Sequence, residues 1–155
     1  MRIRTRLLVG MVTIMICWSG YAQTPQTTVM QAERELFASV NEARRAEGLP
    51  ALRWNEALAT AARRHADIMA DHGTAQHAFD GEPSLSARVK MAGVHFSWLS
   101  ENVTQGPTPV VIHGQFMHSP SHRANILDRD MDSIGVGVVE RGGQLFAVED
   151  FSQVR

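Results

Sequence analysis

Apolar residues in the first half of the chain recur with the spacing of an α-helix. Leu36, Val40 and Ala43 are separated by four and then three residues, so a helix would place all three on one face. Gly48 and Pro50 follow this run, and glycine suits the left-handed conformation in which many helices end. The pattern therefore predicts a helix that ends near Gly48.

A second helical run follows Asn55, a residue type whose side chain accepts hydrogen bonds from the free N–H groups at a helix start. The run extends to His72, and Gly73 directly after it is typical of a helix end. Its many alanines predict close packing against a neighbouring element. The positions with helical spacing are Leu58, Ala61, Ala62, His65, Ile68 and Met69.

Shorter elements are expected in the middle of the chain. Residues 73–83 have the composition of a loop, and a short helix is expected from Ser84 to Met91. Residues 97–104 are compatible with a short strand. Another helix is expected from Pro109 to about His118, since proline is tolerated in the first turn of a helix.

The C-terminal part of the chain changes to the pattern of strands. Residues 134–139 and 145–148 are rich in β-branched and aromatic side chains, and the turn sequence Arg-Gly-Gly-Gln at 141–144 separates them. We expect a β-hairpin whose second strand reaches Phe151. Helices followed by an antiparallel pair predict an α+β fold, with helices packed on a small sheet.

The N-terminal residues have the pattern of a secretory signal. Arg2, Arg4 and Arg6 precede an apolar stretch that reaches about Trp18 and is short for a bilayer span. Small residues then precede an expected cleavage after Ala22. The alternative interpretation is an uncleaved membrane anchor. Cleavage predicts a protein that is secreted or periplasmic, with no stable membrane insertion afterwards.

The length, the charge and the cysteine content limit the classes of protein to which this chain can belong. The chain has 155 residues, enough for one domain, and we expect a signal peptide at 1–22, a disordered leader at 23–30 and the domain at 31–155. Its formal net charge of -1 argues against a nucleic-acid partner, which would favour a strongly basic chain. The single cysteine, Cys17, would leave with the signal, so the exported domain would be free of cysteine.

Three segments combine histidine or carboxylate side chains with loop signals, and they contain His77, Glu101 and His122. Brought together, these side chains could bind Zn²⁺ or perform acid–base chemistry, because imidazole suits divalent metals and a carboxylate can ligate the ion or orient a histidine. No local spacing such as HExxH requires a shared site. Unrelated surface histidines are the alternative.

Seven segments of the chain match the motifs of a known family in the same order: Val40–Arg44 with Gly48–Trp54, Ala61–Met69, Gln76–His77, Ser86–Arg88 with Gly93, Ser100–Asn102, Ser119–Leu127 and Ile134–Gly137. Together they resemble the CAP superfamily, which includes cysteine-rich secretory proteins, plant pathogenesis-related proteins and bacterial secreted domains. The resemblance extends from about Leu36 to Phe151, and the segment at 119–127 resembles the bacterial pattern SPGHRxNIL most closely.

This resemblance implies a fold and a cleft. The family fold is a three-layer α-β-α sandwich with a small, mainly antiparallel sheet. Two histidines and one or two acidic residues line its central cleft in many members, and some of these bind zinc or another divalent cation. Carried over to this chain, the cleft residues are His77, Glu101 and His122, with the two histidines as metal ligands and Glu101 as a third ligand or as an orienting group.

Asn102, Arg123 and Ser119 fall in the same matching motifs and are secondary candidates for the cleft. The chain also departs from the family pattern. The family motif Gly-Glu-Asn aligns with Ser100–Asn102, so Ser100 replaces its glycine. Phe116 replaces a tryptophan of the family pattern, and Ser119 stands where many animal and plant members have a second glutamate. A site with two histidines and one glutamate is therefore expected in place of a four-residue one.

The resemblance favours a secreted binding module over an enzyme. The cleft would recognise an extracytoplasmic ligand such as a peptide, a glycan or a lipid, directly or through the metal ion. One alternative is a hydrolase of protease type in which a metal ion or the His–Glu pair activates water. Another is a lipid or sterol carrier, as suggested for some eukaryotic members.

Overall fold

The computed structural model describes residues 25–154, which form five helices and four strands. The elements in chain order are α1 (Pro25–Ala46), β1 (Arg53–Trp54), α2 (Glu56–His72), α3 (Leu85–Met91), β2 (Phe96–Gly106), α4 (Pro109–His118), α5 (Pro120–Ile126), β3 (Ser133–Arg141) and β4 (Gln144–Val154).

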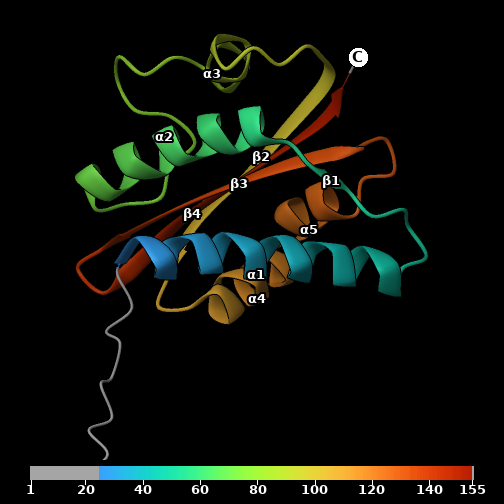
Figure 1. Cartoon of the computed structure of the whole chain (residues 1–155), viewed down its shortest axis with the longest axis horizontal. Coiled ribbons are helices and arrows are strands. Elements are labelled where there is room, and N and C mark those ends of the chain that lie inside the picture. Colours follow the sequence, from blue (N-terminus) through green and yellow to red (C-terminus); the bar gives the residue numbers. More distant parts are fainter. Residues whose placement is uncertain (1–24, 155) are drawn as a thin grey trace, which may run out of the picture.

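The strands form one sheet in the order β1-β3-β4-β2. β1 runs parallel to β3, and the pairs β3–β4 and β4–β2 are antiparallel. Helices α2 and α3 cover one face of the sheet, and α1, α4 and α5 cover the other (Figure 1). The expected three-layer α-β-α sandwich with a mainly antiparallel sheet is therefore confirmed.

Helix α2 lies directly on the backbone of β3. A Cβ atom added at Gly135 would be 2.1 Å from the backbone nitrogen of Ala59, and one added at Gly137 would be 2.2 Å from that of Arg63. Only glycine leaves room for this approach. The facing surface of α2 is built from small side chains such as Ala62, which is fully buried. The close packing expected from the alanines of this helix is confirmed.

The two ends of α2 are also as expected. The Asn55 side chain accepts hydrogen bonds from the backbone N–H groups of Ala57 and Leu58. Gly73 follows the last turn with a φ of 67°, in the left-handed region. Because both ends of α2 are fixed, the loop that follows it starts at a defined point.

The expected leader at 23–30 is wrong for most of its length, because helix α1 already begins at Pro25. Proline fits the first turn of a helix, and Val29 and Ala32 pack against the main core, so tertiary contacts extend the helix beyond its polar start. The expected signal peptide, 1–22, lies outside the described residues. No helix within residues 25–154 is long and apolar enough to cross a membrane.

Two short elements, β1 and α5, were not expected from the sequence. β1 has two residues and is held by hydrogen bonds from Arg53 N to Asp132 O and from Asn55 N to Ile134 O. α5 has seven residues, too few for helical periodicity to show. The strand expected at 97–104 is longer in the structure and spans Phe96–Gly106.

The contact between α2 and β3 makes a prediction about stability. Gly137→Ala should destabilise the fold by about 2–3 kcal/mol or more, because the new methyl group must displace backbone atoms of α2. Gly114→Ala in α4 is the matched control: nothing lies within 4 Å of its added Cβ, and alanine should stabilise that helix by up to about 1 kcal/mol. Urea unfolding measures both changes. Equal stability of the two variants would contradict the close contact.

Candidate functional site

His77, Glu101 and His122 meet at the free edge of β2, the last strand of the sheet. Glu101 lies on β2, His77 lies in the loop between α2 and α3, and His122 lies on α5. His77 Nδ1 is 2.9 Å from Glu101 Oε1. The ring centroids of His77 and His122 are 6.4 Å apart. Since α2 and α5 cover opposite faces, the two imidazoles come together from both sides around this strand.

Glu101 is a buried carboxylate with a defined set of partners. One oxygen accepts the hydrogen bond from His77, and the other forms a short ion pair with Arg88 of α3. The side chain of Arg88 is itself buried. A guanidinium group at this position offsets the cost of burying the carboxylate. Glu101 therefore has a fixed position below the exposed ring of His77.

His65 of α2 holds the loop that carries His77. Its ring is fully buried, with Nδ1 2.6 Å from Glu82 Oε1 and Nε2 2.9 Å from the carbonyl oxygen of Gln76. A carbonyl oxygen only accepts hydrogen bonds, so Nε2 of His65 carries a hydrogen atom. The bond to Gln76 fixes the residue directly before His77. Neither this role of His65 nor the role of Glu82 was predicted from the sequence.

The two imidazoles of the cleft differ in their affinity for protons. The hydrogen bond to Glu101 raises the pKa of His77 above its ordinary value. Burial lowers the pKa of His122, and the nearby His77 lowers it further. Within the described chain, neither ring nitrogen of His122 has a hydrogen-bond partner, and its ring contacts the edge of Phe116 at a centroid distance of 5.3 Å. His122 therefore offers a neutral ring over a wider pH range than His77.

Asn102 connects β2 to α5 on the other face of the sheet. It is fully buried, and its Nδ2 donates to the carbonyl oxygen of His122 and to Glu149 Oε2, both at 3.2 Å. Asn125 Nδ2 donates to Asn102 Oδ1 at 2.9 Å. These bonds fix α5 on the strand that carries Glu101. Asn102 thus positions the backbone of His122, and its side chain is not exposed to a ligand.

The other two secondary candidates lie at the start of α5 and within it, and both have local partners. Ser119 is the residue before the first turn of α5, and its Oγ lies 3.2 Å from Ser121 Oγ. Arg123 forms an exposed ion pair with Glu47 at 2.8 Å. Neither side chain is bonded to His77, Glu101 or His122.

Two further acids on β4 are fully buried beside the site, and neither was predicted from the sequence. Burial raises the pKa of Glu149 to about 8. Asp150 faces Glu101 in the register of β2 and β4, and burial together with the charge of Glu101 raises its pKa well above the ordinary range. Both shifts favour the neutral form of these acids. Of the three buried carboxyl groups Glu101, Glu149 and Asp150, Glu101 is the one that accepts a hydrogen bond from His77.

The described residues do not form a closed metal site. No group of three or more histidine, cysteine or acidic side chains in residues 25–154 is arranged to hold a metal ion. His77 and His122 supply two imidazoles, while Glu101 is bonded to His77 and Arg88. A carboxylate that binds the far nitrogen of a ligand histidine orients that ring. Any ion here would take its remaining ligands from water or from a bound molecule.

Comparison with known proteins identifies the family of this chain. The model of the CAP family, described as the cysteine-rich secretory protein family, matches residues 37–151. The chain belongs to the CAP family. This confirms the resemblance that the sequence motifs indicated.

Relatives of this CAP domain include protein YkwD of Bacillus subtilis (strain 168), which is 31% identical over 117 residues, covering 75% of this chain and 46% of YkwD. Membrane protein YlbC of the same strain is 29% identical over 115 residues, covering 73% of this chain and 32% of YlbC. The chain thus spans less than half the length of these two curated relatives.

Solved structures share the fold of this CAP domain. An extracellular protein containing an SCP domain from Bacillus anthracis str. Ames aligns with a TM-score of 0.76 and 25% identity, over 85% of this chain and 44% of that chain. An outer surface protein from Borrelia burgdorferi aligns with a TM-score of 0.74 and 20% identity, over 81% of this chain and 94% of that chain. The second likeness concerns the fold alone.

The bond between His77 and Glu101 predicts a change in titration. Glu101→Gln should lower the pKa of His77, because the amide stabilises the imidazolium less than the carboxylate does. NMR titration of the histidine side chains measures this shift. Glu47→Gln, which removes an exposed acid just after the end of α1, is the control and should leave the pKa of His77 unchanged. An unaltered His77 titration in Glu101→Gln would contradict the bond.

Proposed function

We propose that this CAP domain is an extracytoplasmic binding module whose ligand occupies the cleft at His77 and His122. The proposal rests on one observation: two imidazoles from opposite layers of the fold lie side by side over a buried carboxylate. Burying a charge costs free energy. The contacts of Glu101 with Arg88 and His77 nevertheless hold this buried carboxylate beside the exposed ring of His77. Perturbed titratable groups of this kind cluster at functional sites.

Binding is preferred over covalent catalysis because the cleft contains no activated nucleophile. A serine nucleophile needs a base within hydrogen-bond distance, whereas no serine hydroxyl in the described chain is bonded to a histidine. The only cysteine, Cys17, precedes the described residues. A hydrolase in which a metal ion or the His–Glu pair activates water remains the second candidate, since the two imidazoles differ in pKa and could divide the roles of acid and base.

We propose that a divalent cation such as Zn²⁺ completes the binding site. His77 would use the ring nitrogen that does not face Glu101, and His122 would use one of its two unbonded nitrogens. When bound, the ion would act as a Lewis acid that attracts an anionic or carbonyl oxygen of the ligand. Glu101 would hold the ring of His77 in one orientation and strengthen it as a ligand.

The location outside the cytoplasm is part of the same proposal. The aligned protein from Bacillus anthracis is described as extracellular. The signal pattern of residues 1–22 agrees with this location. N-terminal sequencing of the exported protein should give Gln23 as the first residue, and intact Met1 in a cytosolic fraction would oppose the proposal.

Zinc binding is tested by isothermal calorimetry at neutral pH. The unaltered protein should bind one equivalent of Zn²⁺, and His77→Ala and His122→Ala should each abolish the binding while the domain stays folded. Binding should weaken as pH falls, beginning above about 6.5, because the raised pKa of His77 lets protons compete early. His95→Ala, which removes an exposed histidine outside the cleft, is the matched control and should bind as the unaltered protein does.

The competing explanation is that these residues only brace the cleft. In that case the unaltered protein would show no affinity for Zn²⁺, and His77→Ala and His122→Ala would mainly lower the melting temperature. That pair of results would refute the metal site. It would leave a metal-free binding cleft to be tested with ligands directly.

A further inference from the structure

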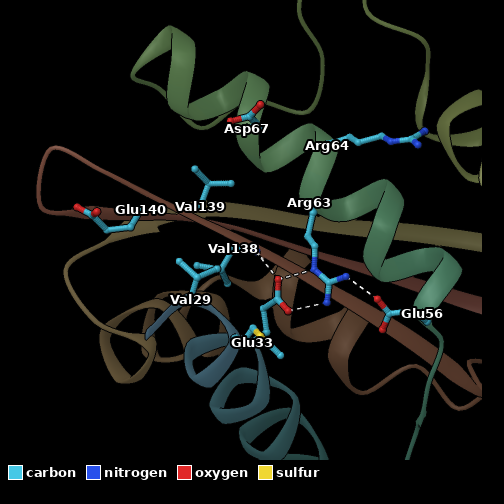
Figure 2. A pocket seen from close by; sticks show the side chains of 10 residues that line it. Val29, Glu33, Glu56, Arg63, Arg64, Asp67, Val138, Val139 and Glu140 are labelled. Atoms are coloured by element: carbon cyan, nitrogen blue, oxygen red, sulfur yellow. Dashed lines mark hydrogen bonds and ion pairs between the residues drawn. The ribbon is translucent and has the colours of Figure 1, made fainter. Parts of the chain in front are cut away.

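Glu33 and Arg44 show how this fold satisfies buried charged side chains outside the cleft. Glu33 accepts hydrogen bonds from Arg63 at both oxygens, at 2.8 and 2.7 Å, and one oxygen also accepts from the backbone N–H of Val138 (Figure 2). The guanidinium group of Arg44 donates from all three nitrogens to backbone carbonyl oxygens. A buried polar atom without such a partner is therefore an exception that needs a physical explanation.

Three side chains on the α2–α3 side of the sheet contain such exceptions. Within the described chain, Nε of Arg88, both carboxyl oxygens of Asp150 and the hydroxyl oxygen of Ser152 are inaccessible to solvent and have no hydrogen-bond partner. Arg88 is 6% exposed, while Asp150 and Ser152 are fully buried. Each of these polar atoms lost its bonds to water on folding, so leaving it without a partner would destabilise the fold.

The sheet register places these atoms in one buried region. Asp150 is opposite Glu101 of β2 and opposite Gly135 of β3, which faces α2. Ser152 is two residues further along β4, so its side chain points to the same face as that of Asp150. Arg88 of α3 is ion-paired to Glu101, the neighbour of Asp150. Burial and the charge of Glu101 raise the pKa of Asp150, and the charge of Arg88 opposes them, so the guanidinium group acts on this carboxyl group at short range.

The chemistry of the three groups matches one bridging water molecule. None of the unpartnered atoms bonds directly to another of them, and a polar contact too long for a direct hydrogen bond is commonly bridged by water. Nε–H of Arg88 donates, an oxygen of Asp150 accepts whether or not the acid is protonated, and the hydroxyl of Ser152 does either. Buried water typically makes about three hydrogen bonds, so one molecule can satisfy all three groups.

The charges around the same region argue against an ion as the occupant. A cation there would lie beside the guanidinium group of Arg88, and an anion would lie beside the carboxyl groups of Asp150 and Glu101. In a buried environment, repulsion between like charges is stronger than in water. A neutral molecule that both donates and accepts hydrogen bonds avoids both repulsions.

We propose that a water molecule is bound in the interior between α3 and β4, where it accepts from Arg88 Nε, donates to Asp150 and bonds to the hydroxyl of Ser152. The water completes the partners of Arg88, whose terminal nitrogens are ion-paired to Glu82 and Glu101. It thereby connects β4 to the guanidinium group that holds Glu101. The site is on the interior side of Glu101 and does not depend on the function proposed for the cleft.

The site is tested on the unaltered full chain, by high-resolution crystallography and by NMR of the ¹⁵N-labelled protein. The crystal structure should show a water molecule at about 2.7–3.2 Å from Arg88 Nε, from one oxygen of Asp150 and from Ser152 Oγ. In solution, the Nε proton of Arg88 should give a rotating-frame cross-peak with water. The sign of this cross-peak distinguishes a bound water from exchange of the proton with solvent.

Two variants test which side chain holds the water. Ser152→Val replaces the hydroxyl by methyl groups, so the water loses a partner and space, and the cross-peak at Arg88 should disappear. Ser100→Ala is the matched control, because it removes another buried hydroxyl without a partner in the described chain. Ser100 precedes Glu101 on β2 and so faces the other side of the sheet, and its loss should leave the cross-peak unchanged.

Three results would overturn the proposal. The first is a crystal structure in which Ser152 bonds directly to Asp150, Arg88 Nε bonds to a protein oxygen and no water lies between them. The second is a metal ion or a halide at this position, identified by its anomalous scattering. The third is an Arg88 cross-peak that persists in Ser152→Val or disappears equally in Ser100→Ala. The first two results come from the unaltered protein, so they decide the question even where Ser152→Val fails to fold.

Discussion

The contact of α2 with the backbone of β3 at Gly135 and Gly137 sets the position of everything in the cleft. A helix this close to the sheet buries the ring of His65 beside β2, where it bonds to Gln76 and Glu82. Those bonds turn the loop after α2 back over the strand. His77, the next residue after Gln76, then lies within hydrogen-bond distance of Glu101. A larger residue at either glycine would move α2 away from the sheet and so disrupt the contacts of His65 and His77.

The other half of the cleft is built independently from the opposite layer. Asn102 and Asn125 fix α5 to β2, so the backbone of His122 is bonded to the strand that carries Glu101. Because β2 is an edge strand, side chains from both layers reach it without crossing the sheet. Burial raises the pKa of Glu149 and of Asp150, and the charge of Glu101 raises that of Asp150 further, so both acids bind a proton more readily than an exposed carboxylate does.

Much of this arrangement could be predicted from the sequence, for reasons that particular residues illustrate. The sequence of α2 has helical periodicity, a cap at Asn55 and a glycine end at Gly73, and the sequence of the β3–β4 hairpin has a glycine turn. The meeting of His77, Glu101 and His122 followed only from the resemblance to a family, because no local spacing joins residues so far apart. The roles of His65 and Glu82 depend on the path of a loop, which periodicity does not reveal.

The central claim is that His77 and His122 share one ligand ion, with Glu101 orienting the ring of His77. Anomalous diffraction at the zinc absorption edge, from crystals grown with Zn²⁺, tests it most directly. The account predicts one peak bonded to a ring nitrogen of each histidine, at about 2.0–2.1 Å, with Glu101 still bonded to the other nitrogen of His77. The account would be contradicted by a map in which both imidazoles are well defined and no anomalous peak lies between them. A zinc ion bound to Glu101 but to neither histidine would also contradict it.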